Sequence, residues 1–197
     1  MAISLQKPVI EMRWHGRGGQ GVVTASRLLA EAALEEGLYF QTTPDFGAER
    51  SGAPIMAYSR FANEPISNRS NVTEPDVIIV FDPTLIGRVN FLNGIKDETI
   101  VVLNTTQTPK EIVEKLKLQG QTVCTVDATG IAMKLLGRNI PNVPIIGAII
   151  KALPVVSYER AHETVKNRLS QRFNERIVKA NLDALQQGYQ ESQLGGV

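Results

Sequence analysis

Two short, continuous apolar runs, Val77–Phe81 and Ile100–Leu103, constrain the fold of this chain more than any other feature. Strands that are buried on both faces have such runs, whereas half-exposed strands alternate apolar and polar residues. Each run precedes a segment with helical spacing, Thr84–Leu92 after the first and Pro109–Leu118 after the second. This alternation predicts an α/β fold: a three-layer α/β/α sandwich with a mainly parallel, Rossmann-like sheet.

The other expected elements fit the same architecture. We predict further strands at Val9–Trp14, Tyr39–Thr43, Pro54–Phe61 and Val123–Val126. Helices are expected at Val22–Ala33, Thr129–Leu136, Ile145–Ala152, Tyr158–Leu169 and Ile177–Leu185. The first of these helices should be capped by Thr24 or Ser26. Residues 1–197 are predicted to form a single domain, in which 170–197 is a C-terminal helix and tail whose last residues, Leu194–Val197, are frayed.

Charge and composition exclude several classes of function. With 21 basic and 20 acidic side chains, the net charge of +1 creates no large field for nucleic acid or an anionic membrane. A single cysteine, Cys124, allows no internal disulfide, zinc site or iron–sulfur cluster built from this chain's thiolates. No run reaches the ~18–20 apolar residues of a membrane span, and the N-terminus lacks a secretory signal pattern. We therefore expect a cytoplasmic protein.

The strongest local signal is GRGGQG at residues 16–21, between the first expected strand and the first helix. Glycines at this position let free backbone N–H groups and the positive end of the helix face an anion. A tight turn with no ligand is the alternative, and the strand–loop–helix context favours the phosphate site. The candidate contacts are Gly16, Arg17, Gly18, Gly19, Gln20 and Gly21. The segment is not a Walker loop, because no Lys-Ser or Lys-Thr follows Gly21.

A dinucleotide site would also need an acidic residue at the end of the second strand, to hold the ribose. The residues there are Phe40–Thr43, and Asp45 and Glu49 come only in the next loop. Binding of NAD is therefore the weaker interpretation of the glycine pattern.

The loop Thr43–Pro54 could face the glycine segment, because loops at the carboxyl ends of neighbouring strands line the ligand crevice of α/β sheets. Arg50 would then join Arg17 as a second guanidinium for a polyphosphate, with Ser51 beside it. Glu49 either orients Arg50 or forms an ordinary surface ion pair with it.

Structural roles are expected for the remaining polar residues of interest. Asp82 and Asp127 each follow a predicted strand and should cap the next helix. Cys124 should be an inert core residue. His15 has no acid or thiol near it in the sequence, which indicates a hydrogen-bonded structural residue.

Six motifs in a fixed order resemble the gamma subunit of the 2-oxoacid:ferredoxin oxidoreductases, the pyruvate synthase group. They are HGRGGQG at 15–21, FGAERSGAP at 46–54, EPDV at 74–77, DPT at 82–84, VDAT at 126–129 and IGA at 146–148. The resemblance extends from about residue 9 to about residue 170.

That resemblance implies oxidative decarboxylation of a 2-oxoacid such as pyruvate, with the acyl group passed to coenzyme A and electrons to ferredoxin. Alpha and beta subunits would hold thiamine diphosphate and magnesium, and 4Fe-4S clusters would also lie on partners, including a ferredoxin-like delta subunit. The glycine segment with Arg17, and a basic pair at the position of Glu49 and Arg50, would contact coenzyme A. The pair here is acid plus base, so this implication extends to Arg50 and not to Glu49.

Two other functions remain open at this point. A free-standing Rossmann domain would bind NAD or FAD by itself. A purely structural gamma subunit would use Arg17 and Arg50 in interface ion pairs. The residues do not identify the 2-oxoacid.

Overall fold

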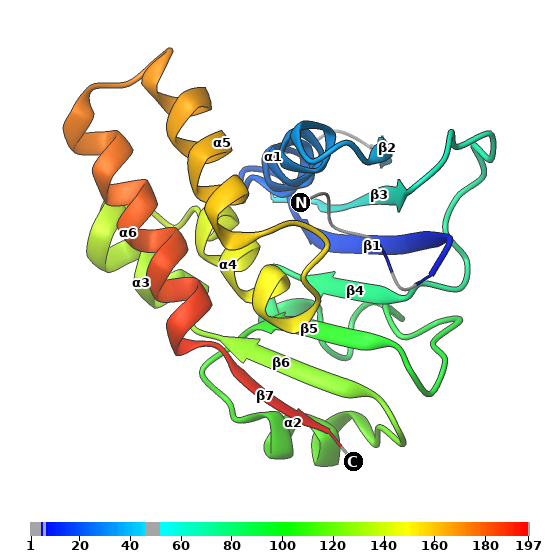
Figure 1. Ribbon diagram of the computed structural model, residues 1–197. Helices are drawn as coiled ribbons and strands as arrows, with labels where there is room; N and C mark the ends of the chain where they lie inside the picture. Colours follow the sequence, from blue (N-terminus) through cyan, green and yellow to red (C-terminus); the bar gives the residue numbers. More distant parts are fainter. Residues whose placement is uncertain (1–4, 6, 46–51, 197) are drawn as a thin grey trace.

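The computed structural model describes residue 5, residues 7–45 and residues 52–196. A single seven-stranded sheet forms its centre, with helices on its faces (Figure 1). The strands are β1 (Val9–Arg17), β2 (Tyr39–Asp45), β3 (Pro54–Ala62), β4 (Val77–Val80), β5 (Ile100–Asn104), β6 (Thr122–Val126) and β7 (Gln193–Gly196). The α-helices are α1 (Val22–Glu35), α2 (Pro109–Leu116), α3 (Ala128–Leu136), α4 (Asn142–Ala152), α5 (Tyr158–Ser170) and α6 (Glu175–Glu191).

The strand order is β2-β3-β1-β4-β5-β6-β7. The inner strands β1, β4, β5 and β6 are parallel, whereas β3 and β2 on one side and β7 on the other pair antiparallel. The predicted α/β class is confirmed, and the parallel strands form the middle of the sheet. The strand that follows α1 is an edge strand, β2, and not the parallel neighbour of β1 that a dinucleotide-binding fold requires.

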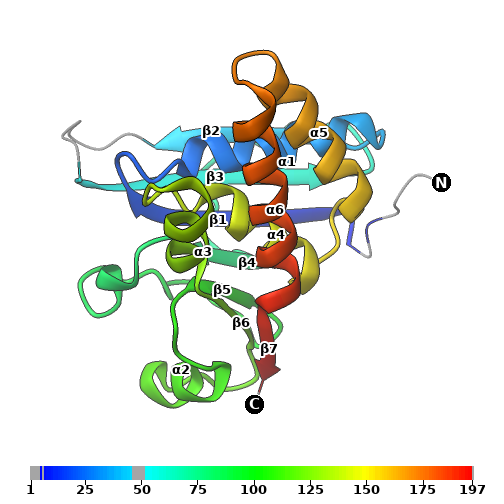
Figure 2. The same ribbon diagram turned by 90° about the vertical axis from the view of Figure 1, so that its left-hand side faces the viewer.

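Helices α1, α3, α4, α5 and α6 lie on one face of the sheet (Figure 2). The larger core lies under them and includes side chains of β1 and α4, such as Trp14 and Ile149. On the other face α2 covers β5 and β6, where Ile112 packs in a second cluster with Val101 and Val123. Both faces of the parallel strands are therefore buried, as their continuous apolar runs predict.

Helices α4 and α6 touch at two glycines. A Cβ atom at Gly147 would collide with the Leu185 carbonyl oxygen, and one at Gly188 would collide with the carbonyl oxygen of Pro144. Only hydrogen atoms in place of side chains let the two backbones approach this closely. The IGA motif at 146–148 thus has a packing role.

The expected helix at Thr84–Leu92 is wrong. A 3-10 turn at Pro83–Leu85 is followed by turns, and Gly87 adopts a left-handed φ of 79°. The buried guanidinium of Arg13 on β1 donates to the carbonyl oxygens of Phe91 (2.8 Å) and Asn93 (2.5 Å). This long-range donor favours an irregular loop here, because it satisfies carbonyls that would otherwise be unpaired.

The expected fraying of Leu194–Val197 is also wrong for its described residues. β7 pairs antiparallel with β6, Leu194 opposite Cys124. Without it, β6 would expose a row of unpaired backbone groups at the sheet edge. A Cβ at Gly195 would lie 2.8 Å from Pro109, so glycine also lets the strand pass α2.

Candidate functional site

The glycine segment 16–21 joins the end of β1 to the start of α1, as expected. Gly16 is still part of β1, where a Cβ atom would collide with the Val22 side chain and lie 3.1 Å from Phe81 Cβ. Gly19 and Gly21 have positive φ angles of 97° and 82°, which glycine adopts at little cost. The glycines therefore have different roles: Gly16 allows close packing, Gly19 turns the chain, and Gly21 does both, because a Cβ there would lie 2.9 Å from Asn142.

Gln20 fixes the shape of this segment. Its side-chain oxygen accepts the Arg17 backbone N–H at 2.8 Å, and its amide nitrogen donates to Asp82 Oδ2 at 2.8 Å. One side chain thus closes the turn and attaches it to the end of the neighbouring strand β4.

The Arg17 guanidinium is already engaged by three groups. Its Nε lies 3.1 Å from Asp82 Oδ2, Nη1 donates to the Gly52 carbonyl at 3.0 Å, and Nη2 donates to the Thr84 hydroxyl at 2.9 Å. A guanidinium carries five N–H donors, so two remain for a further anion. The side chain is 23% exposed, which leaves it accessible from solvent.

Asp82 is the centre of the network. It caps the Pro83–Leu85 turn as predicted, because its Oδ1 accepts the Thr84 backbone N–H at 2.8 Å and the Thr84 hydroxyl at 2.6 Å. Burial alone would raise the pKa of Asp82. The hydrogen bonds from Thr84 and Gln20, together with the Arg17 charge, outweigh burial and lower that pKa below its ordinary value. The carboxylate stays ionised and holds two loops together.

The N-terminus of α1 has no side-chain cap. The predicted capping by Thr24 or Ser26 is wrong: Gly21 is the N-cap residue, and both candidates lie inside the helix, where the Ser26 hydroxyl donates to the Val23 carbonyl. Among the described residues, no hydrogen-bond acceptor is found for the backbone N–H groups of Gly19, Gly21, Val22, Val23 and Thr24. Such N–H groups at the positive end of a 14-residue helix suit an anionic ligand.

Other N–H groups of the segment are occupied. Gly18 donates to the Ala53 carbonyl at 3.0 Å, and Gln20 donates to the Arg17 carbonyl at 3.2 Å. Three of the five N–H groups without acceptors therefore belong to the first turn of α1 and not to the six candidate positions. Val22, Val23 and Thr24 carry no distinctive side chain, and only the strand–loop–helix context could have indicated them.

The second motif ends beside the glycine segment. Besides the Gly18–Ala53 bond, Gly52 donates to the Gly18 carbonyl at 3.4 Å, and β3 begins at Pro54 opposite Arg17. The residues Glu49, Arg50 and Ser51, two of them candidate contacts, lie outside the described residues.

His15 lies on β1 directly before the segment and is 3% exposed. Its Nε2 atom is buried with no hydrogen-bond partner among the described residues, so the predicted hydrogen bond is not found there. Burial and, to a lesser degree, the nearby Arg13 charge lower the pKa of His15 to about 4. The imidazole is therefore neutral at pH 7.

Cys124 is a core residue, as predicted. Its thiol is buried on β6, 3.7 Å from the Ala148 carbonyl oxygen, and burial raises its pKa to about 11. In the described ranges, no three His, Cys, Asp or Glu side chains lie close enough together to hold a metal ion. Asp127 caps α3 as predicted, with Oδ1 accepting the Gly130 N–H at 2.8 Å.

None of the described helices is long and apolar enough to cross a membrane.

Comparison with known proteins gives consistent matches over nearly the whole chain. A model of the pyruvate ferredoxin/flavodoxin oxidoreductase family matches residues 11–191. The common gamma subunit of the Pyrococcus furiosus pyruvate and ketoisovalerate oxidoreductases is 46% identical over 176 residues, 89% of this chain and 95% of that protein. The Thermotoga maritima pyruvate synthase subunit PorC is 40% identical over 185 residues, 94% of this chain and 95% of that protein.

Solved structures agree with this match. The crystal structure of the Thermotoga maritima pyruvate oxidoreductase subunit PORC superimposes with a TM-score of 0.84 at 36% identity, covering 96% of this chain and 99% of that one. A Magnetococcus marinus 2-oxoglutarate:ferredoxin oxidoreductase, solved with 2-oxoglutarate, coenzyme A and succinyl-CoA bound, shares the fold. That match has a TM-score of 0.76 at 22% identity and covers 93% of this chain and 31% of the larger one.

Proposed function

This chain belongs to the pyruvate ferredoxin/flavodoxin oxidoreductase family and is a gamma-type subunit of a 2-oxoacid:ferredoxin oxidoreductase, and we propose that it binds coenzyme A in that enzyme. The overall reaction converts a 2-oxoacid, coenzyme A and two oxidised ferredoxins into acyl-CoA, carbon dioxide, two reduced ferredoxins and a proton. Pyruvate is the proposed 2-oxoacid, because both relatives described above are named for it, the Pyrococcus furiosus subunit together with ketoisovalerate.

The uncapped start of α1 is the observation that supports this role. Gly19, Gly21 and the first residues of α1 offer N–H groups without acceptors among the described residues, and Arg17 has donors to spare. Backbone N–H groups and a guanidinium are suitable donors for the diphosphate of coenzyme A. Arg50 and Ser51 are proposed as further contacts from the second motif.

The contribution of this subunit is to hold the thiol substrate near the acyl donor. Orientation of two reactants can supply up to ~7–11 kcal/mol in ideal intramolecular cases, without any proton transfer by the protein. Thiamine diphosphate supplies the decarboxylation chemistry when bound, and we place it, with magnesium and the 4Fe-4S clusters, on alpha, beta and delta partners. The buried thiol of Cys124 supports this division, because it is unsuited to hold a cluster.

The geometry of Arg17 supports a second candidate role, which is structural. Its three internal bonds hold the Gly52 and Thr84 loops against the glycine segment, so its loss would disturb the site even without direct contact to coenzyme A. Binding of NAD is not supported by the sheet, since β2 is an antiparallel edge strand.

The experiment uses the enzyme assembled with its partners. We expect pyruvate-dependent formation of acetyl-CoA with reduction of ferredoxin, and Arg17→Ala should raise the KM for coenzyme A about tenfold. Release of carbon dioxide from the 2-oxoacid, measured in a single turnover without coenzyme A, should be unchanged. An unchanged KM for coenzyme A would contradict the binding role, and a stable free chain that binds NAD would contradict the subunit role.

A further inference from the structure

The turn between α5 and α6 projects away from the sheet (Figures 1 and 2). We define the hairpin tip as residues 166–179, which include the end of α5, the connecting turn and the start of α6. No part of the glycine segment or of its hydrogen-bond network lies in this tip. Its side chains therefore take no part in the candidate coenzyme A site.

The hairpin tip is strongly basic. It holds five of the 21 basic residues of the chain and one of the 20 acidic residues: Lys166, Arg168, Arg172, Arg176 and Lys179 against Glu175. Arg168 lies 3.8 Å from Glu31, and Lys179 lies 2.9 Å from Asp183. No described carboxylate lies within 4 Å of the charged nitrogens of the other three basic residues. The rest of the chain, by contrast, carries more acidic than basic side chains.

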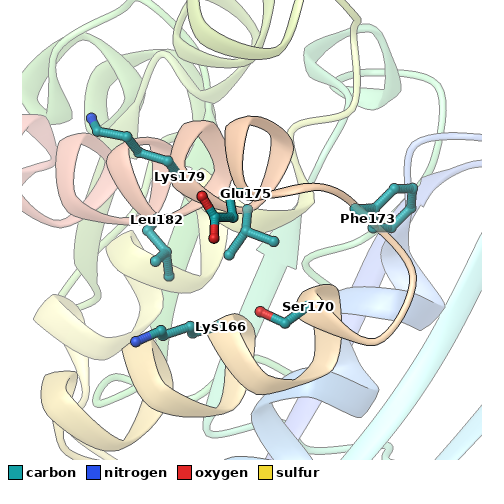
Figure 3. A pocket seen from close by; sticks show the side chains of 7 residues that line it. Lys166, Ser170, Phe173, Glu175, Lys179 and Leu182 are labelled. Atoms are coloured by element: carbon teal, nitrogen blue, oxygen red, sulfur yellow. The ribbon is translucent and has the colours of Figure 1, made fainter.

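A groove of about 480 Å³ lies between the two helices of this hairpin. Figure 3 shows Lys166 and Ser170 on α5 across from Glu175 and Leu182 on α6, with Phe173 in the connecting turn. The apolar lining is provided by Phe173, Val178 and Leu182. Phe173 is 47% exposed, and burial of the rest of its side chain would be worth about 1 kcal/mol.

Apolar exposure continues on the adjoining surface of α6, where Ile177 is 40% exposed four residues after Phe173. Scattered exposed apolar residues are ordinary on protein surfaces, but a groove with an apolar lining and a basic border is typical of a docking surface. Of the two lysines that line the groove, Lys179 pairs with Asp183, and Lys166 has no carboxylate within 4 Å among the described residues. Together with Arg172 and Arg176 in the same tip, it favours a covering segment that carries carboxylates.

We propose that the hairpin tip docks a neighbouring subunit of the same enzyme, through a segment that carries carboxylates around one or more apolar side chains. This inference rests on the subunit role of the chain and not on the coenzyme A site. A second copy of the chain is disfavoured, because a symmetric contact would bring two basic tips together. An electron carrier that docks transiently is disfavoured by the apolar groove, because permanent interfaces are the more apolar ones.

Zero-length carbodiimide cross-linking of the assembled enzyme tests the contact directly, because it joins an amine only to a carboxylate that touches it. We expect Lys166 to be joined to an Asp or Glu of a partner subunit, as identified by mass spectrometry. Cross-links from Lys166 only within this chain, only to a second copy, or only to added ferredoxin would each contradict the proposal.

A charge-reversed variant gives an independent test. Lys166→Glu with Arg172→Glu places like charges across the interface, and we expect its affinity for the partner subunits to fall about a hundredfold. The matched control is Lys110→Glu with Lys134→Glu, two exposed basic residues on α2 and α3. It should assemble like the wild type.

Equal assembly of both variants would overturn the proposal, and so would equal dissociation of both. If the reversed variant were poorly folded, Lys166→Gln with Arg172→Gln should still assemble with a weaker salt dependence than the wild type. Unchanged salt dependence would count against the contact. If the charge-reversed variant assembled normally and only its KM for coenzyme A changed, the docking proposal would be contradicted, and the coenzyme A site would be affected instead.

Discussion

Gly19 lies in a turn where its own backbone N–H has no acceptor among the described residues, whereas at Gly147 and Gly188 the missing side chain lets two helices touch. A Cβ at Gly19 would meet nothing within 4 Å, and one at Gly188 would meet backbone. The same residue type thus serves a proposed ligand site in one motif and close packing in the other. Substitutions should separate the two roles, with stability changing at the helix contact and substrate use changing at the glycine segment.

The largest effect is expected at the helix contact. Gly188→Ala places its Cβ against the Pro144 carbonyl and 2.7 Å from Pro144 Cα, so α4 and α6 must move apart. We expect the free energy of unfolding to fall by about 3 kcal/mol, after an offset of about 1 kcal/mol from the higher helix propensity of alanine. Urea denaturation measures this, with Gln186→Ala at an exposed position of α6 as the control. A loss below about 1 kcal/mol would mean that the contact can relax.

An intermediate effect should come from a change of pH, and it should arise at His15, the residue before the glycine segment. The folded pKa of His15 is about 4 against an ordinary value of 6.5, so the unfolded chain takes up a proton first as the pH falls. The neutral His15 imidazole therefore favours the folded state fully above pH 6.5, and this advantage is lost as the pH falls toward 4. At pH 5 the free energy of unfolding should be about 2 kcal/mol lower from this group alone than at pH 8.

The variant His15→Asn should therefore lose less stability than the wild type between pH 8 and pH 5 in thermal or urea unfolding. His162→Asn, which changes the only other histidine, is the control and should keep the wild-type slope. If His15→Asn kept that slope as well, the buried imidazole would not be the source.

The smallest effect is expected at Asp82, the residue that joins Gln20, Thr84 and Arg17. Asp82→Asn keeps an oxygen for Thr84 but removes the charge beside Arg17 and one acceptor for Gln20. We expect a tenfold higher KM for coenzyme A with little change in kcat, equivalent to about 1.4 kcal/mol. Asp127→Asn, an equivalent cap on α3, should leave the KM unchanged. Equal effects of both substitutions would indicate general loosening.

Local patterns were sufficient for most of the fold. The strands β4 and β5 were predicted within one residue at each end, because both faces of these strands are covered by apolar packing. Helix α2 was also predicted, where Pro109 follows the cap Thr108. The strand β7 was missed because Gln193–Gly196 has no strand-like composition, and only the unpaired edge of β6 explains it.

The candidate site could be predicted less completely. The position of the glycine segment and the capping role of Asp82 follow from local spacing. The bond between Gln20 and Asp82 spans 62 positions, and the Arg13 contacts that shape the loop after β4 span 78 and 80. Such contacts depend on the strand order, which no local pattern contains.

The most direct test of the central claim compares two variants of one glycine. Gly19→Asp and Gly19→Asn have the same shape, meet the same backbone strain at a φ of 97°, and place a Cβ that meets no neighbour, so they differ chiefly in one negative charge. In the assembled enzyme, the KM for coenzyme A should be about tenfold higher for Gly19→Asp than for Gly19→Asn. Equal values would show that the phosphates of coenzyme A do not bind at this turn.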